Sequence, residues 1–208
     1  MDEKGLLHKK ALRLEYFTVG YNVFEALVAI AAGKIAGSIS LIGFGMDSIA
    51  ESLSGLVMIW RLRKYGRMDR DEEERIERRA RRFVGLTFVL LAVYVLVESV
   101  RKIVLKEIPA PSVPGIVIAV LSLIIMPLLA RMKFKIGKEL EMGSLVADAK
   151  ETVVCSFLSL ALLIGLVMRI AFDFRLADPI VGLVIVVYLF KEGSELLFEK
   201  EEEHENKE

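Results

Sequence analysis

The sequence predicts an all-α membrane protein with six transmembrane helices and with both termini in the cytoplasm. Composition is the first observation: 54% of the 208 residues are hydrophobic and the mean hydropathy is +0.50, although 27% are charged. The charged residues must then cluster between long apolar stretches, a pattern that soluble domains rarely show. The apolar windows and the distribution of Lys and Arg around them are the other two observations.

Six mostly apolar windows can be marked along the chain, and each is long enough to cross about 30 Å of hydrocarbon at about 1.5 Å per helical residue. They cover residues 12–33, 39–60, 83–105, 114–130, 144–168 and 176–198. Polar or turn-rich connections separate them, among them residues 131–143, and a charged tail, 199–208, follows the last window. We therefore expect residues 1–208 to form one six-helix membrane domain.

Basic residues are concentrated in every second polar segment. Lys4, Lys9, Lys10 and Arg13 lie at the start of the first window or before it. Ten Lys and Arg residues within 61–82 follow the second window, and the fourth window is followed by Arg131, Lys133, Lys135 and Lys138. The positive-inside rule places these segments and both termini in the cytoplasm, as in a multi-pass protein of the cell membrane. The formal net charge is zero and gives no indication of a nucleic-acid partner.

Four polar side chains lie inside the apolar windows as two pairs. Asp47 and Glu51 belong to the second window, Glu151 and Cys155 to the fifth, and the members of each pair are four residues apart. That spacing puts both members on one helix face. Three carboxyl groups and a thiol are suitable ligands for a divalent metal, and acidic groups inside a membrane mark ion pathways.

Counting residues tests whether the two pairs meet. From the cytoplasmic ends of their windows, Glu51 and Asp47 lie about 15 and 21 Å deep at about 1.5 Å per residue. Glu151 and Cys155 lie about 12 and 18 Å deep on the same scale. Small residues are frequent around all four positions, which lets membrane helices approach closely. The sequence therefore predicts one metal site near mid-membrane, between the second and fifth helices.

Each group also has a simpler explanation when it is taken alone. A buried carboxyl can form an interhelical hydrogen bond, and a lone cysteine can pack as a small apolar residue. However, a charge at the bilayer centre costs at least about 2.5–3.5 kcal/mol, so three acids in one layer require protons or a cation. Such acids should hold protons without a metal and release them to a divalent ion, because ligands bind deprotonated. Metal and protons should exchange.

Other intramembrane polar residues receive lesser roles. Asn22 and Glu25, three residues apart in the first window, should line a pathway or form a hydrogen bond with a neighbour. Glu98 lies near Arg101 at the end of the third window, which predicts an interfacial ion pair.

Two acids near the ends of windows are also assigned. Asp148 is expected to face a cytoplasmic vestibule, with Lys150 neutralising it. Asp178, followed by Pro179, marks the start of the last helix, where Asp can cap and Pro fits the first turn.

Two segments resemble the cation diffusion facilitator family of cation efflux proteins: SISLIGFGMDSIAES at 38–52 and LVADAKETVVC at 145–155. Asp47 and Glu51 match two acids of the family's second helix. Glu151 stands where its fifth helix commonly has His, and Cys155 where it has Asp. The resemblance covers roughly residues 10–198 and depends on the order and spacing of these segments.

The resemblance implies a homodimer that exports divalent transition metals from the cytoplasm, usually in exchange for protons. The ligand set with Cys155 favours zinc-like ions, with Cd²⁺, Fe²⁺ and Mn²⁺ as further candidates. The family's cytoplasmic metal-sensing domain is not expected, because only ten residues, most of them charged, follow the last window. The sequence leaves the physiological metal, the coupling stoichiometry and the dimer surface open.

The sequence allows three alternative functions. Intramembrane aspartyl proteases carry Gly-x-Gly-Asp, whereas Gly43, Gly45 and Asp47 have one residue too many between them, so no enzyme activity is expected. An exporter of organic cations needs an aromatic-lined acidic pocket, and the second and fifth windows offer few aromatic residues: Phe44, Trp60 and Phe157. A membrane scaffold without transport activity is the third alternative.

Overall fold

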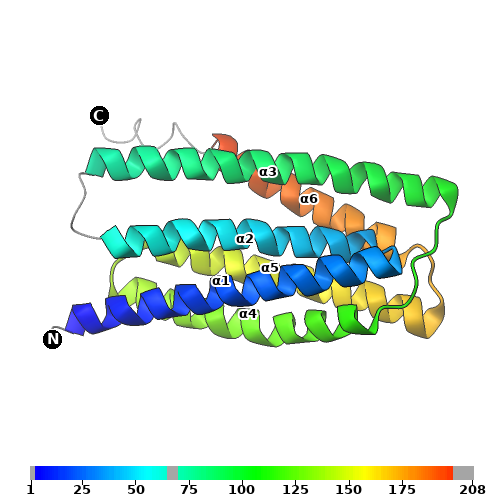
Figure 1. Cartoon of the computed structure of the whole chain (residues 1–208), viewed down its shortest axis with the longest axis horizontal. Helices are drawn as coiled ribbons and strands as arrows, with labels where there is room; N and C mark the ends of the chain where they lie inside the picture. Colours follow the sequence, from blue (N-terminus) through cyan, green and yellow to red (C-terminus); the bar gives the residue numbers. More distant parts are fainter. Residues whose placement is uncertain (1–2, 65–69, 199–208) are drawn as a thin grey trace.

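The computed structural model describes residues 3–64 and 70–198, which form six α-helices and no strand (Figure 1). The six-helix prediction is confirmed. The helices are α1 (Glu3–Ala36), α2 (Ile39–Lys64), α3 (Arg70–Leu105), α4 (Val113–Glu139), α5 (Gly143–Phe172) and α6 (Ala177–Phe198). The expected tail, 199–208, lies outside the described residues.

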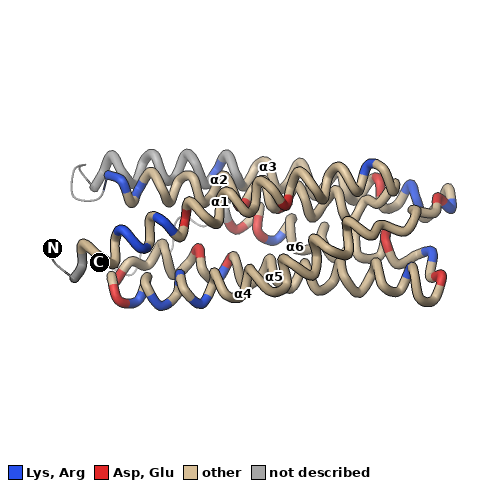
Figure 2. The backbone as a smooth tube through the Cα atoms, turned by 60° about the horizontal axis from the view of Figure 1, so that its bottom comes forward, with Lys and Arg blue, Asp and Glu red and all other residues tan. Residues whose placement is uncertain are grey.

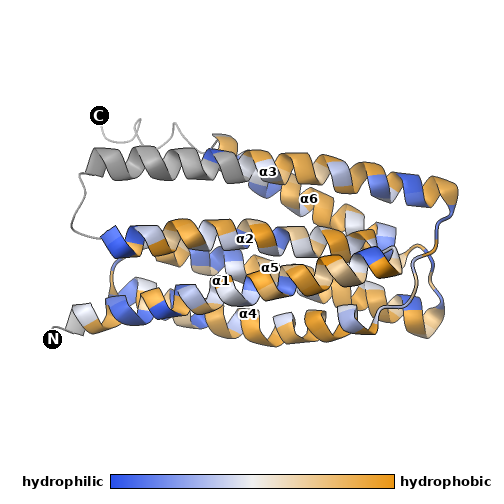
Figure 3. Ribbon diagram, viewed as in Figure 1, coloured by the Kyte–Doolittle hydropathy of each residue, from blue (hydrophilic) through white to orange (hydrophobic). Residues whose placement is uncertain are grey.

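Four helices are long and apolar enough to cross a membrane by length and composition: α1 from Gly5, α2, α4 and α5. Figure 3 shows that apolar residues dominate the middle of the bundle. α6 carries additional charges, Asp178, Lys191, Glu192 and Glu195, and α3 carries Glu98, Arg101 and Lys102 near its end. The chain is therefore a multi-pass membrane protein.

The helices pack as two groups. α1 packs most extensively on α2, α4 on α5, and α3 on α6, while α1 also contacts α4. α2 is the central helix, since it contacts α1, α3, α5 and α6. Figure 1 shows α1, α2, α4 and α5 lying side by side, with α3 and α6 on another side. The two helices with the predicted metal ligands thus face the interior.

Glycine permits the closest of these approaches. A Cβ atom at Gly45 of α2 would lie 3.1 Å from the carbonyl oxygen of Ala26 in α1. A Cβ atom at Gly193 of α6 would lie 2.9 Å from the carbonyl oxygen of Gly85 in α3. Without a side chain, the backbones can approach closely, as membrane helices require.

α4 continues well beyond its apolar window. The sequence placed residues 131–143 in a connection, and that expectation is wrong for residues 131–139, which are helical. Lys, Arg and Glu are good helix formers, and basic residues in the last turn interact favourably with the helix dipole. Only residues 140–142 connect α4 to α5.

Asp178 connects two helices at the end of the bundle that carries the α1–α2 turn. Its carboxylate accepts hydrogen bonds from the backbone N–H groups of Ile39 at 3.0 Å and Ser40 at 3.3 Å. The hydroxyls of Ser38 and Ser40 each donate to it at 2.5 Å. Asp178 was expected to cap its own helix, but here its carboxylate satisfies free N–H groups at the start of α2.

Candidate metal centre

The four predicted ligands lie on two helices that contact each other, α2 and α5. Asp47, Glu51 and Cys155 are buried and Glu151 is half-buried. Figure 2 shows acidic positions in the middle of the bundle, away from its charged ends. That the four side chains share one metal site stays a prediction.

Hydrogen bonds join the two helices at this level. The hydroxyl of Thr152 on α5 donates to Glu51 Oε1 at 2.9 Å. The hydroxyl of Ser54 on α2 donates to Glu151 Oε2 at 3.3 Å. Each helix therefore supplies a hydroxyl that orients a carboxyl of the other, which fixes α2 and α5 against each other.

Two carboxyl oxygens in the cluster remain available. Within the described part of the chain, Asp47 Oδ1 and Glu51 Oε2 are buried and have no hydrogen-bond partner. Buried acceptors are normally satisfied, so unsatisfied ones are candidates for binding a proton or a cation. No three His, Cys, Asp or Glu side chains among the described residues lie close enough together to hold one metal ion. The side chains must move closer to share one.

α6 contributes to the centre, which the sequence did not predict. The hydroxyl of Tyr188 lies 4.0 Å from the sulfur of Cys155. Glu192, one turn further along α6, is within electrostatic reach of Asp47 and Glu151. The i, i+4 spacing of Tyr188 and Glu192 was the available signal, since it matches that of the predicted pairs.

A second cluster of buried charges lies next to the centre. Lys133 of α4 is fully buried, and its Nζ lies 2.5 Å from Asp148 Oδ2 and 3.3 Å from Glu15 Oε2. Lys133 also donates to the Thr152 hydroxyl at 3.5 Å, and that hydroxyl in turn donates to Glu51. The Thr152 side chain thus links the second cluster to Glu51 of the candidate metal centre.

Two expectations about this region are wrong. Lys150 does not neutralise Asp148, because Lys150 is exposed while the buried Lys133 forms the ion pair. Lys133 was assigned to a cytoplasmic connection, but it points into the bundle between α1 and α5, where two acids compensate its charge. Glu15 was not predicted at all, although its position inside the first apolar window was a signal.

Of the other intramembrane polar residues singled out from the sequence, Glu25 and Glu98 have local partners and Asn22 has none among the described residues. Glu25 accepts hydrogen bonds from Ser48 at 3.0 Å and Tyr21 at 3.3 Å, which satisfies the expectation of a hydrogen bond to a neighbour. The Asn22 side chain is buried and has no hydrogen-bond partner in the described residues. The predicted interfacial pair is present, since Arg101 lies 2.9 Å from Glu98.

Comparison with known proteins gives the family. The model of the cation efflux transmembrane domain matches residues 17–200, which is most of the chain. The chain belongs to the cation efflux family. The resemblance inferred from residues 38–52 and 145–155 is thereby confirmed.

Three curated relatives of this cation efflux protein match at low identity. It is 24% identical to Transmembrane protein 163 of Xenopus laevis, over 92% of this chain and 67% of the relative. It is 26% identical to an uncharacterized transporter of Methanocaldococcus jannaschii, over 82% and 61%. It is 23% identical to the magnetosome protein MamB of Magnetospira sp., over 87% and 61%. The chain thus spans about two thirds of the length of these relatives.

Proposed function

We propose that this protein exports divalent transition-metal cations from the cytoplasm, in exchange for protons, through Asp47, Glu51, Glu151 and Cys155. One observation carries the proposal. In this chain of the cation efflux family, hydrogen bonds join the two helices beside these groups, from Thr152 of α5 to Glu51 and from Ser54 of α2 to Glu151. The four proposed groups present the oxygen and sulfur ligands that divalent transition metals accept.

Exchange with protons follows from the burial of the cluster. Ionised acids at mid-membrane need compensation, and Asp47 Oδ1 and Glu51 Oε2 have no hydrogen-bond partner among the described residues. Protons and a divalent cation can each provide that compensation, but a metal requires deprotonated ligands. Binding of one therefore releases the other, and this competition is the basis of antiport.

The expected substrate is zinc-like because one of the four ligands is a thiol. Sulfur ligands favour Zn²⁺ and Cd²⁺, while Fe²⁺ and Mn²⁺ are further candidates that accept carboxylates. The metal is the transported substrate and no resident cofactor is proposed. The protein acts as a carrier, with no catalytic role, in the cell membrane. We further propose that it works as a homodimer, with the bundle end that holds the α4–α5 connection facing the cytoplasm.

Transport by the purified chain in proteoliposomes tests this function. At equal pH on both sides, external Zn²⁺ should enter the vesicles while protons leave, so that a zinc dye and a pH dye trapped inside both respond. Asp47→Asn should abolish both signals. Asp173→Asn is the matched control, because Asp173 is exposed at the end of α5 and should leave both unchanged. Zinc entry without proton movement would contradict antiport, and absence of zinc entry would contradict the function.

A further inference from the structure

A fourth acid lies near the proposed metal centre, on a helix that supplies none of the four proposed ligands. Glu192 of α6 is within electrostatic reach of Asp47 and Glu151, and also of Tyr188 on its own helix. Like charges gathered in a membrane interior are unfavourable unless a cation or protons compensate them. The position of Glu192 therefore suggests a role in cation binding.

Helix geometry independently places Glu192 opposite Glu151. α5 and α6 are consecutive helices joined by residues 173–176, they contact each other, and they run in opposite directions. Tyr188 and Cys155 meet across this pair at 4.0 Å. One helical turn closer to the α4–α5 connection, α5 carries Glu151, four residues before Cys155. At the same turn α6 carries Glu192, four residues after Tyr188. Residues four apart share a face, so these two acids occupy the next facing positions on the two helices.

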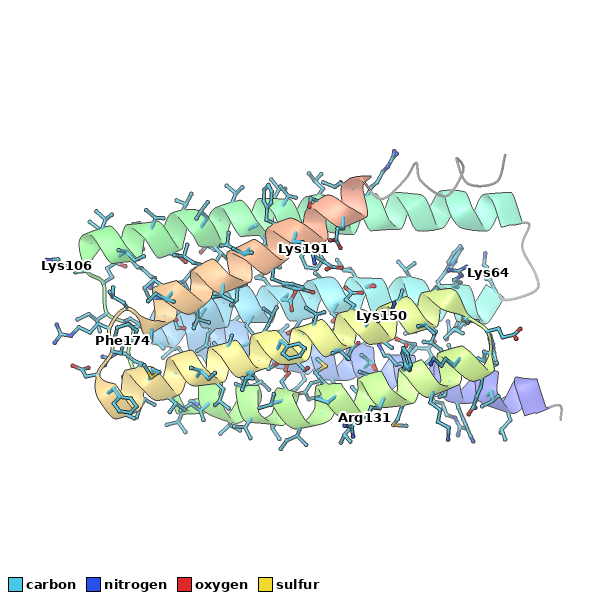
Figure 4. All side chains as sticks on the ribbon, turned by 180° about the vertical axis from the view of Figure 1, so that it is seen from behind. Lys64, Lys106, Arg131, Lys150, Phe174 and Lys191 are labelled. Carbon is cyan, nitrogen blue, oxygen red and sulfur yellow. The ribbon has the colours of Figure 1, made fainter. Side chains whose placement is uncertain are left out.

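Glu151 and Glu192 differ in solvent exposure from the proposed ligands deeper in the bundle. Glu151 and Glu192 are partly exposed, whereas Asp47 and Cys155 are buried. Figure 4 shows α5 and α6 diverging from their connection at Phe174 toward Lys150 and Lys191, the residues next to the two acids. Glu151 and Glu192 thus lie where the centre reaches the side of the bundle.

A buried acceptor lies beyond this pair. Asp47, with only 2% of its surface exposed, has an oxygen, Oδ1, without a hydrogen-bond partner in the described residues. Asp47 is electrostatically coupled to both Glu151 and Glu192. Asp47 therefore offers a buried oxygen without a partner to a cation that moves inward from Glu151 and Glu192.

We propose that Glu192 is a fifth metal-binding residue, which with Glu151 binds the divalent cation before it reaches Asp47 and Cys155. The inference rests on the proposed function and adds a first binding step to it. Two carboxylates are hard oxygen ligands that accept Zn²⁺, Fe²⁺ and Mn²⁺ alike. Capture is then unselective, and selection for zinc-like ions takes place at the thiol.

Calorimetric titration of Zn²⁺ into the purified full chain in detergent tests this assignment. Glu192→Gln keeps the shape of the side chain but removes a charged ligand, so Zn²⁺ affinity should fall by about tenfold or more. The matched control is Glu195→Gln, since Glu195 is an exposed acid on the same helix, 3.7 Å from Lys191. Its Zn²⁺ affinity should stay within about twofold of wild type, as expected for an exposed pair.

A histidine at this position separates ligation from a general effect of charge. Glu192→His lacks the negative charge but offers a nitrogen ligand for Zn²⁺, so it should restore most of the affinity that Glu192→Gln loses. The assignment would be overturned if Glu192→His bound Zn²⁺ as weakly as Glu192→Gln, or if Glu192→Gln kept the wild-type affinity. It would also be overturned if Glu195→Gln lost as much Zn²⁺ affinity as Glu192→Gln. Asp47→Ala distinguishes the two proposals: if it also binds Zn²⁺ as wild type does, the proposed metal centre itself fails.

Discussion

The sulfur of Cys155 lies 4.0 Å from the Tyr188 hydroxyl and is coupled to three acids, Asp47, Glu51 and Glu151. A cation bound there would have one soft ligand among several hard ones. Sulfur strengthens binding of Zn²⁺ and Cd²⁺ more than binding of Mn²⁺. The metal preference of the centre should therefore depend on this one side chain.

Cys155→Ser should lower Zn²⁺ and Cd²⁺ affinity by about tenfold or more while changing Mn²⁺ affinity much less. Zn²⁺ binding should also tighten more steeply with rising pH in wild type than in the Ser variant, because the thiol must lose its proton before it binds metal. Cys155→Asp should shift preference toward Mn²⁺ and Fe²⁺. Calorimetric titrations across pH measure these changes, and an unchanged metal ranking in the Ser variant would reassign Cys155 to packing.

Single residues differ in how far the sequence could predict them. Asp47 and Cys155 stand out because they interrupt apolar windows, and their spacing indicates a shared face. Glu192 does not, since it follows Lys191 near a charged helix end where solvated side chains are expected. Lys133 was misassigned because basic residues after an apolar window normally lie outside the membrane. Its burial depends on acids from two other helices, which a sequence pattern does not reveal.

At the level of helices, Lys133 holds α1, α4 and α5 together through Glu15 and Asp148. Lys133→Met should lower the free energy of unfolding by about 3 kcal/mol, because removing one partner leaves buried acids uncompensated. Lys135→Met is the matched control: Lys135 is exposed on the same helix and should change stability by less than about 0.5 kcal/mol. Unfolding in detergent gives both values, and equal effects would contradict the role given to Lys133.

Asp178 similarly joins α6 to the start of α2 with four hydrogen bonds. Asp178→Asn loses the charge that favours this helix N-terminus and at least part of the bonding, so hydrogen exchange at residues 39–41 should become faster. Asp173→Asn makes the same change at an exposed position and should leave that exchange unaltered. Protection of residues 39–41 that is equal in both variants would show that packing alone holds this end.

The helices themselves were largely predictable, but their ends were not. Apolar windows report the part of a helix that crosses hydrocarbon, and α4 and α3 continue into charged sequence that forms helix equally well. The same limit explains why residues 131–139 were expected to be a connection. Hydropathy indicates whether a segment prefers lipid or water, whereas the position at which a helix ends depends on capping and on charge compensation.

For the whole molecule, the sequence predicted six helices but not their grouping into α1, α2, α4 and α5 beside α3 and α6. That grouping depends on close contacts such as Gly45 with Ala26 and Gly193 with Gly85, between positions far apart in the chain.

The asymmetric distribution of Lys and Arg does predict the orientation of the protein in the membrane. A cysteine at Glu139 should be shielded from an impermeant thiol reagent in intact cells, and one at Ala110 should react, both in a Cys155→Ser background. The opposite labelling pattern would show the reverse orientation in the membrane and would contradict the orientation on which the proposed export depends.

Assembly is also a property of the whole molecule. Family membership suggests a homodimer, whose contacts within these residues must come from lipid-facing helix surfaces packing closely. Light scattering of the detergent complex should give the mass of two chains. A monomer that still transports Zn²⁺ in vesicles would show that dimerisation is dispensable.

The location of the metal tests the central claim most directly. Crystals soaked in Zn²⁺ and measured on both sides of the zinc absorption edge should show one anomalous peak between α2 and α5, within ligand distance of Asp47, Glu51, Glu151 and Cys155. Asp47→Ala crystals soaked in the same way should lose that peak. A peak only elsewhere in the wild-type chain, or a peak that persists unchanged in Asp47→Ala, would contradict the account.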